Sequence, residues 1–242
     1  MNRKYINKMR IAVIIPAYNE EASIGRCLES IKKQDYKDYE IIVVNAESKD
    51  RTAEISSKYA DKVITAKTGS PGPARNVGVK NTDAEIVAFT DADTIVAGNW
   101  LERIAKDFED PKVVGAGGVL RPLDARTLDR IMFKINSDWW YRISALFGFY
   151  QLGTPNCAYR RTAYNQAGGF DESLSMLEDT ELSLRMRKYG KIVIDKDMVV
   201  YNSARRFVQE GYTRVFFRYL KEYINLFSGK RVRSKHFDTI DH

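Results

Sequence analysis

The chain has 242 residues, of which 44% are hydrophobic and 29% charged, and its formal net charge is +7. A chain of this kind can bury a sizeable core in one large domain or two small ones, and its charge favours anionic partners such as nucleotides, nucleic acid or an acidic membrane surface. Both histidines, His236 and His242, lie at the C-terminal end, which excludes a catalytic triad, a His-rich zinc site or a phosphohistidine in the body of the chain.

Apolar runs alternate with segments of helical periodicity between residues 11 and 90. The runs predict buried strands at 11–15, 40–45, 62–66 and 85–90. One face of the first helix is formed by Ile24, Cys27, Leu28 and Ile31. Asp50 is placed to cap the second helix, and Pro73 suits the first position of the third. This alternation predicts an α/β fold with a mostly parallel, doubly wound, Rossmann-like sheet.

The pattern changes after residue 95. Helices are predicted within 98–110 and 177–191, with Gly190 ending the second. A glycine-containing strand is predicted at 112–120 and short strands at 192–202. Residues 128–153 are long and aromatic, and residues 153–172 are rich in loop-forming residues.

The cysteines and the N-terminus bear on the cellular compartment. Cys27 and Cys157 are expected to be reduced thiols. No stretch reaches the roughly 18 apolar residues of a membrane-spanning helix, and residues 1–10 are not followed by the apolar region of a signal peptide. The sequence therefore predicts a cytoplasmic protein.

Asp91 and Asp93 follow the fourth strand with only Ala92 between them. Carboxylates at the end of a buried strand lose hydration, so a positive partner is expected. Carboxylate oxygens suit Mg²⁺ or Mn²⁺, with water and a diphosphate completing the shell. The alternative for an isolated D-x-D pair is a capped strand end with solvated aspartates.

The D-x-D pair is not isolated. The segments "VIIPAYNEE", "IIVVNAESKDRTAE", "GPARNVGVKNTDAEIVAFTDAD" and "LEDTELSLRMRKYG" occur in this order. Together they resemble the family 2 glycosyltransferases, which are inverting enzymes of the GT-A fold, and the resemblance covers roughly residues 11–210. It implies a GT-A-like domain with acceptor-side insertions and a C-terminal helical tail. A single domain is expected over 1–242, with a nucleotide-binding half (about 1–95), an acceptor half (96–205) and a basic, aromatic tail (206–242).

The resemblance also assigns roles to individual residues. The nucleotide-binding set that it implies is Pro16, Ala17, Tyr18, Glu20, Asn45, Glu47, Ser48, Asp50, Arg75, Asp91 and Ala92. Within this set Arg75 matches a position that contacts the diphosphate. Asp93 and Asp91 match the ligands of Mn²⁺ or Mg²⁺, and Asp93 and Asn156 match positions beside the donor sugar and the acceptor. Asp179, in Glu178-Asp179, matches the catalytic base; a plain N-cap aspartate beside a Glu181–Arg185 pair is the alternative.

Two positions depart from the family pattern. Asn45 stands where an Asp usually contacts the base, so the preference for UDP or GDP is open. Asn202 lies near a position where relatives often have a metal-binding His. The metal is therefore expected to bind more weakly, or to have its coordination shell completed by water.

The expected reaction transfers a sugar from a UDP- or GDP-sugar to a hydroxyl acceptor, a glycan or a lipid-linked saccharide, in polysaccharide or glycolipid synthesis. A carboxylate base is needed by a hydroxyl and not by a lipid phosphate, which is already largely ionised. Transfer to a polyprenyl phosphate and a non-catalytic nucleotide-binding homologue remain the alternatives. No nucleic-acid partner is expected, because a nucleic-acid binder would not need carboxylates at two strand ends.

The tail from Ser203 mixes basic and aromatic residues. The apolar ones at near-helical spacing are Val215, Phe216, Tyr219, Leu220, Tyr223 and Phe227. They predict a helix that packs on the core or on a second subunit, or lies on an anionic membrane at its inner face. Trp139, Trp140, Phe147 and Phe149 present the same alternatives, together with an acceptor groove.

Overall fold

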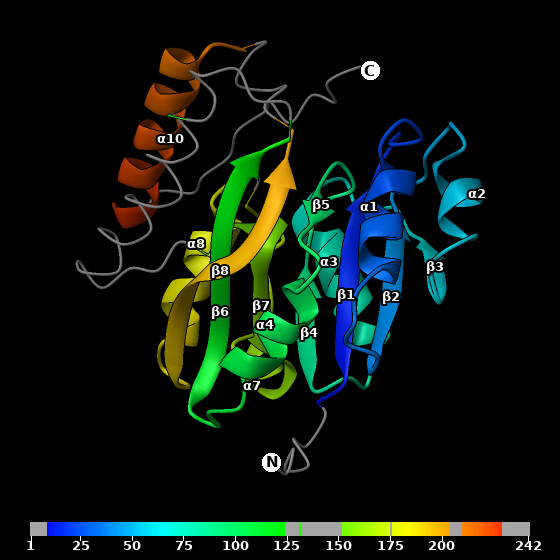
Figure 1. Ribbon diagram of the computed structural model, residues 1–242. Coiled ribbons are helices and arrows are strands. Elements are labelled where there is room, and N and C mark those ends of the chain that lie inside the picture. Colours follow the sequence, from blue (N-terminus) through cyan, green and yellow to red (C-terminus); the bar gives the residue numbers. More distant parts are fainter. Residues whose placement is uncertain (1–8, 124–130, 132–151, 175, 204–209, 229–242) are drawn as a thin grey trace.

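The computed structural model describes residues 9–123, 131, 152–174, 176–203 and 210–228. Within these ranges one sheet runs through the molecule in the order β3-β2-β1-β4-β7-β6-β8-β5 (Figure 1). The predicted aromatic stretch 139–150 and the end of the tail lie outside the described residues.

The first half of the sheet is parallel, as the alternating pattern predicts. Its strands are β1 (Ile11–Ala17), β2 (Tyr39–Asn45), β3 (Lys62–Thr65) and β4 (Ile86–Phe89). The connecting helices are α1 (Ile24–Lys32), α2 (Thr52–Ser56) and α3 (Pro71–Lys80). The third helix therefore begins two residues before Pro73, at Pro71. Parallel neighbours end at the same edge of a sheet, so the polar residues after β1, β2 and β4 meet there.

The second half is mixed rather than parallel. It comprises β5 (Ile95–Val96), α4 (Trp100–Asp107), β6 (Val113–Pro122), η2 (Thr154–Asn156), β7 (Cys157–Arg160), α7 (Arg161–Gln166), α8 (Glu178–Met186), β8 (Lys191–Asn202) and α10 (Tyr212–Phe227). Strand β7 runs antiparallel to both β4 and β6, while β6 and β8 are parallel. Instead of short strands, β8 is one long strand with a register shift where Gly118 and Val119 pair with Asp195 and Val199.

Helix α8 ends at Met186, so Gly190 is not its cap. A Cβ atom at Gly190 would lie 2.5 Å from the carbonyl oxygen of Lys112. The glycine is therefore required by close backbone approach before β8 and not by a helix end.

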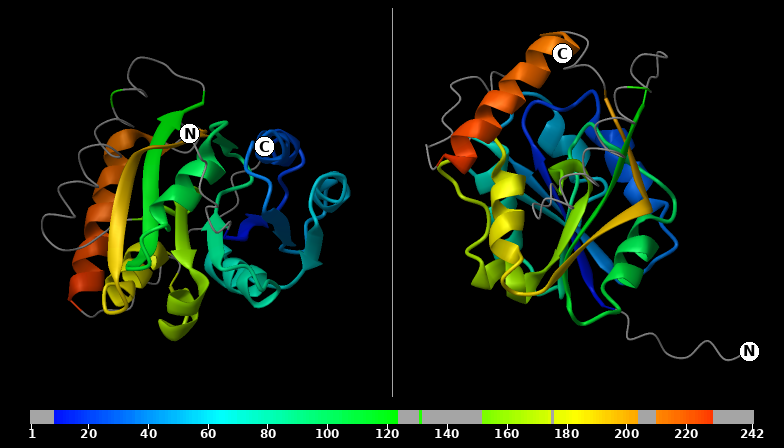
Figure 2. Two further views of the ribbon diagram at one scale, coloured as in Figure 1. Left: turned by 60° about the horizontal axis from the view of Figure 1, so that its bottom comes forward. Right: turned by 90° about the vertical axis from the view of Figure 1, so that its left-hand side faces the viewer.

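Both faces of the sheet are covered. On β1, Ile11, Val13 and Ile15 belong to a core that includes α1 and α4, whereas Ala12 and Ile14 face α3, α7 and α8. Figure 2 shows these layers from two further directions. The four apolar residues predicted to share a face of α1 are all fully buried. Among the described helices, none is long and apolar enough to span a bilayer.

Helix α3 lies unusually close to the sheet. A Cβ atom at Gly78 would be 2.4 Å from Cγ2 of Ile14 on β1. Only glycine permits this spacing without moving α3 or the strand. The same helix carries Arg75, so its close contact with β1 sets the position of that guanidinium.

Candidate active site

The carboxyl ends of β1 and β4 bring three acidic residues together. Glu20 follows β1, and Asp91 and Asp93 follow β4. Burial, and then the charges of Asp93, Asp91 and Glu20, raise the pKa of the Cys27 thiol on α1. The parallel pairing of β1 with β4 places the loops that carry these three carboxylates at the same edge of the sheet.

The loops after β1 and β2 are joined by hydrogen bonds. The backbone N–H of Asn19 donates to Oγ of Ser48 (3.0 Å), and the side chain of Asn19 accepts from the backbone N–H of Lys49 (2.9 Å). The backbone N–H of Glu21 donates to Asp50 (3.0 Å). Asn19 and Glu47 have left-handed backbone angles, φ 52° and 58°, a conformation that these contacts help to hold.

Asp50 stabilises the loop that leads into α2. It accepts hydrogen bonds from the backbone N–H (3.0 Å) and hydroxyl (2.6 Å) of Thr52, the first residue of α2. The N-cap position of α2 is Arg51, so Asp50 lies one residue before the cap that the sequence predicts for it. Burial acts to raise the pKa of Asp50, but the hydrogen bonds from Thr52 and Glu21 lower it below its usual range. Asp50 is therefore a charged anchor of this loop.

Asn45 is also engaged within the protein. It is buried, its oxygen accepts from the backbone N–H of Ser48 (3.2 Å), and its amide nitrogen donates to Thr65 (3.4 Å). Tyr18 is exposed, and Pro16 and Ala17 form the end of β1. Of the residues predicted to meet the base, Tyr18 is the one most open to a ligand.

Arg75 is the positive partner that the D-x-D pair requires. Its guanidinium lies 2.8 Å from Oδ1 of Asp91 and 3.2 Å from Oε1 of Glu178, and the residue is only 2% exposed. It also sits 5.7 Å from the ring centre of Phe170. Burial acts to lower the pKa of Arg75, but Asp91 and Glu178 raise it. Arg75 thus remains a cation and joins the D-x-D loop to the start of α8.

Asp179 lies next to this ion pair, in the first turn of α8. Burial, and then the neighbouring Glu178 carboxylate, raise the pKa of Asp179 to about 7. Its Oδ1 atom accepts from the backbone N–H (2.6 Å) and the hydroxyl (3.3 Å) of Thr180. A carboxyl group that titrates near neutral pH is suited to accept a proton in catalysis.

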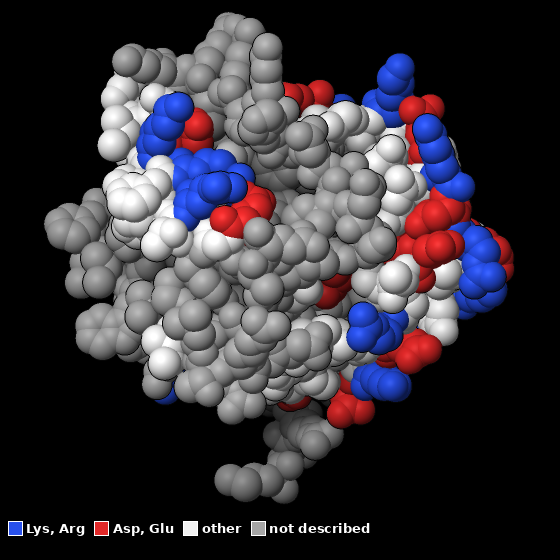
Figure 3. Space-filling view, turned by 90° about the horizontal axis from the view of Figure 1, so that it is seen from above, with Lys and Arg blue, Asp and Glu red and all other residues white. Residues whose placement is uncertain are grey.

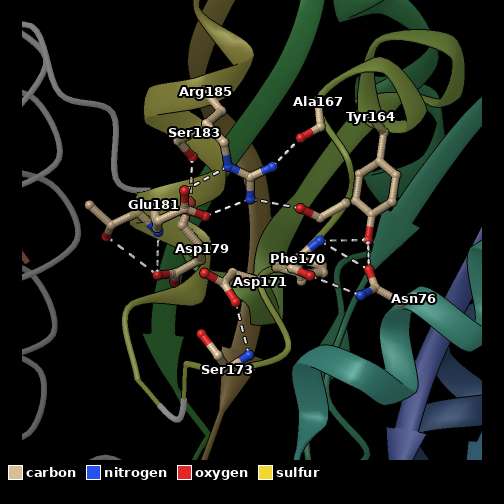
Figure 4. Close-up of polar contacts among 12 residues, drawn as sticks. Asn76, Tyr164, Ala167, Phe170, Asp171, Ser173, Asp179, Glu181, Ser183 and Arg185 are labelled. Atoms are coloured by element: carbon tan, nitrogen blue, oxygen red, sulfur yellow. Dashed lines mark hydrogen bonds and ion pairs between the residues drawn. The ribbon is translucent and has the colours of Figure 1, made fainter. Parts of the chain in front are cut away.

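A clamp holds the turn that carries Phe170 (Figure 4). Asn76 on α3 donates to the carbonyl of Phe170 (2.9 Å) and accepts from its backbone N–H (3.0 Å) and from the hydroxyl of Tyr164 (2.6 Å). On the other side of the turn, Arg185 donates to the carbonyl of Gly169 (2.7 Å). Arg185 also forms the predicted i, i+4 ion pair with Glu181, which holds its guanidinium in place. The sequence predicts the Glu181–Arg185 pair, but it contains no signal that Arg185 also binds the turn that carries Phe170.

The residues available for a divalent cation are the two aspartates. The side chains of Asp91 and Asp93 are both partly exposed. One carboxylate oxygen of Asp91 is not bonded to Arg75. Among the described residues there is no group of three or more His, Cys, Asp or Glu side chains arranged for a metal. Asn202 donates to Thr94 (3.1 Å), so it supports the loop after Asp93. The donor set is two hard oxygen ligands, which fits Mg²⁺ or Mn²⁺ that keeps several ligands from water or phosphate.

Asn156 is buried in the core, contrary to its expected position beside the sugars. Its oxygen accepts from Nε1 of Trp100 (2.8 Å), and its nitrogen donates to the carbonyls of Val119 (3.0 Å) and Met198 (2.9 Å). With 1% of its surface exposed, the side chain has no face for a ligand. It joins η2 to β6, β8 and α4, and we do not propose it as a sugar contact.

Replacing Asn156 with Ala is expected to lower the free energy of unfolding by about 3 kcal/mol, because the indole N–H of Trp100 and two carbonyl groups lose their partner. Urea denaturation measures this. Asn165→Ala, at an exposed position on α7, is the matched control and should change stability little. A stable Asn156→Ala variant with weakened nucleotide-sugar binding would restore the sugar-contact assignment.

The sequence of the chain is similar to those of known glycosyltransferases. A family model described as glycosyl transferase family 2 matches residues 12–167. The chain is 28% identical over 210 residues to the uncharacterized glycosyltransferase EpsJ of Bacillus subtilis (strain 168), covering 79% of this chain and 60% of EpsJ. The chain thus spans less than two thirds of that relative.

Two solved structures share the fold. Staphylococcus aureus TarS 1-349 in complex with UDP-GlcNAc superposes with a TM-score of 0.65 at 26% identity, covering 81% of this chain and 58% of the TarS chain. The mannosyltransferase PcManGT from Pyrobaculum calidifontis, in complex with GDP-Man and Mn²⁺, gives a TM-score of 0.67 at 23% identity, with coverage of 81% and 57%. The second likeness shows the fold alone.

Proposed function

Because the chain belongs to glycosyl transferase family 2, we propose that it transfers a sugar from a nucleoside-diphosphate sugar to a hydroxyl group of a glycan or a lipid-linked saccharide, with inversion at the sugar carbon. The observation that supports this best is Asp179, a partly buried carboxyl group with a raised pKa, next to the ion pairs that join Glu178, Arg75 and Asp91. Arg75 therefore links the D-x-D loop to the segment that carries the proposed proton acceptor.

In the proposed step, the acceptor oxygen forms a bond to the anomeric carbon as the bond from that carbon to the diphosphate oxygen breaks. The hydroxyl proton passes to Asp179, and the leaving nucleoside diphosphate takes the electron pair. Asp179 is the catalytic residue of this proposal, and Glu178 is a positioning residue, because its carboxylate is held by Arg75. A preorganised base and a fixed cation need little rearrangement during the reaction.

Asp91 and Asp93 would hold Mn²⁺ or Mg²⁺. When bound, the ion supplies positive charge to the diphosphate as it leaves. The loops after β1 and β2 form the proposed nucleotide-binding surface, with Tyr18 exposed at its edge. Their mutual hydrogen bonds keep that surface in shape before a nucleotide arrives. The cytoplasmic location and the division near residue 95 into nucleotide and acceptor halves are part of the same proposal.

The donor is tested by release of nucleoside diphosphate from a panel of UDP- and GDP-sugars, with and without saccharide acceptors. TarS is solved with UDP-GlcNAc, so UDP-sugars are tried first. Ligands that bind the folded chain also raise its melting temperature. Thermal shift without turnover by any donor and acceptor pair would favour a non-catalytic nucleotide-binding protein instead.

We expect nucleotide-sugar binding to strengthen when Mn²⁺ or Mg²⁺ is added, and Asp93→Ala to abolish that gain, because the variant loses one of two hard oxygen ligands. Titration calorimetry in EDTA and in Mn²⁺ measures the difference. Asp35→Ala removes an exposed carboxylate after α1 and should keep the full metal effect. Equal affinity in EDTA and in Mn²⁺ for the unaltered protein would contradict the metal proposal.

A further inference from the structure

Helix α10 carries a second apolar face that is exposed in the part of the chain that the structure describes. Its exposed large side chains are Phe216 (59%), Phe217 (65%), Leu220 (42%), Ile224 (60%) and Phe227 (56%). At 3.6 residues per turn these five fall within an arc of about 100°. Single exposed apolar residues are normal, but a contiguous face of this kind marks an interaction surface. We call these five residues the outer face of α10.

The helix is fixed to the protein by its other side. Val215 and Tyr223 are buried, and Tyr223 packs with Leu174, Met176 and Leu177 just before α8. Figures 1 and 2 show α10 lying against the α8 end of the molecule, far from α2. The outer face is thus additional to the face that holds α10 in place.

Basic residues border the outer face. On the helical wheel Lys221 and Arg214 adjoin Phe217, and Arg218 follows them. Lys221 and Arg214 are exposed, whereas Arg218 pairs with Glu210. Seen from above, the side of the molecule that carries α10 shows uncharged side chains beside basic ones, some of which contact acidic side chains (Figure 3). The chain after the helix adds Lys230, Arg231, Arg233 and Lys235 in sequence.

We propose that α10 lies in the interface of an anionic membrane, with its outer face among the acyl chains and Lys221 and Arg214 at the headgroups. A bulky aromatic and aliphatic face beside lysine and arginine is the pattern of interfacial helices. The helix, at 16 residues, is about 24 Å long and lies along the surface.

A second copy of the chain fits this surface less well. Antiparallel pairing of two α10 helices by their outer faces would bring the Lys221 and Arg214 edges of both copies together, and like charges at an interface oppose association. The acidic residue within α10, Glu222, is buried and lies on the packed side. A surface of negative lipid headgroups supplies the missing opposite charge.

Docking would also set the orientation of the candidate active site. Leu177, which packs in the same cluster as Tyr223, has a left-handed backbone (φ 59°) and directly precedes Glu178 and Asp179. Helix α10 and the residues just before α8 therefore belong to one apolar cluster. The membrane inference itself does not depend on the proposed function, because lipid binding is measured without donor or acceptor.

The test is sedimentation of the full chain with vesicles of phosphatidylcholine alone or of an equal mixture with phosphatidylglycerol. We expect binding to the mixed vesicles that weakens at high salt, and much weaker binding to phosphatidylcholine. The double variant Phe217→Ser/Ile224→Ser should bind mixed vesicles about tenfold less tightly or worse. Tyr189→Ser, at an exposed aromatic residue after α8, is the matched control and should bind as the unaltered chain does.

The role of the basic border is tested separately. Lys221→Ser/Arg214→Ser should weaken binding to mixed vesicles by about tenfold. Lys32→Ser/Lys33→Ser removes the same charge from exposed positions at the C-terminal end of α1 and should have little effect. Equal losses in the two pairs would overturn the assignment to α10, because net charge alone would then explain binding.

A labelled variant guards against loss of folding. Cys27 and Cys157, the two cysteines of the sequence, are both fully buried, so a polarity-sensitive dye on Phe217→Cys reports on α10. We expect its emission to shift to shorter wavelength with mixed vesicles. No shift and no sedimentation would overturn the proposal. A dimer that forms without lipid and is broken by Phe217→Ser/Ile224→Ser would assign the outer face to a second copy instead.

Discussion

Asp179→Asn is expected to lower turnover by about 10²-fold or more with a hydroxyl acceptor while nucleotide-sugar affinity is unchanged. The amide keeps the size of the side chain, and its oxygen can still accept from Thr180, but it cannot take up the acceptor proton. Single-turnover assays with saturating donor measure the chemical step, and calorimetry measures the donor affinity. Asp171→Asn, at an exposed position before α8, is the control.

The pH profile gives a second readout of the same residue. A base with a pKa of about 7 is protonated below that pH, so kcat/KM should fall about tenfold per pH unit below pH 7 and level off above it. Asp179→Asn should lose this limb. Full activity of the variant would contradict the assignment of the base and make transfer to a lipid phosphate the leading reaction, because that acceptor needs no base.

Loss of activity in Asp179→Asn should not come from unfolding. The folded chain holds the Asp179 proton more tightly than the unfolded chain, so this group costs stability as the pH rises from about 4 to about 7. An amide has no such cost. The variant should therefore melt at the same temperature as the unaltered chain at pH 8, or higher.

Arg75→Met is expected to lower the free energy of unfolding by about 3 kcal/mol or more and turnover by about 10²-fold or more. The substitution leaves the carboxylates of Asp91 and Glu178 next to each other without the cation that holds both. Arg75→Lys should recover only part of the loss, because an ammonium group cannot reproduce the two-armed contact. Urea denaturation and donor turnover measure the two effects.

The control for Arg75 is another arginine with two good contacts. Arg103 binds Asp195 at 2.7 and 2.8 Å, away from the D-x-D loop, so Arg103→Met should cost stability but preserve turnover of the folded protein. A double-mutant cycle with Glu178→Gln should show coupling of about 1 kcal/mol or more between Arg75 and Glu178. Independent effects would mean that Arg75 acts on the diphosphate and does not position Glu178.

The sequence predicts best what depends on local periodicity. Ile24, Cys27, Leu28 and Ile31 lie on one helical face, and all four are buried in the structure. The need for a cation beside Asp91 also follows from the sequence, because a strand-end carboxylate requires compensation. The choice of Arg75 as that cation depends on tertiary structure, because the absence of a side chain at Gly78 lets α3 pack closely on Ile14 of β1.

The roles of Asn156 and Gly190 differ from the predicted ones because both depend on contacts between distant segments. Asn156 lies in a segment that is rich in loop-forming residues, yet its side chain bonds to Trp100, Val119 and Met198 in the core. Gly190 looks like a helix end, but its role comes from the carbonyl of Lys112 on the approach to β6. Periodicity carries no information on either contact, since neither partner lies within the same element.

The position of β7 has a consequence for synthesis of the chain. Ala88 of β4 pairs with Ala158 of β7, and Ile95 of β5 pairs with Tyr201 of β8. While a ribosome is still making the intervening residues, the finished β1–β4 block has an open edge at β4, and its fully apolar strand offers backbone groups to any other nascent chain. Pairings across such long sequence separations also form slowly. The interval before Cys157 emerges is therefore the period of greatest aggregation risk, when a chaperone that shields β4 would raise the yield of folded protein most.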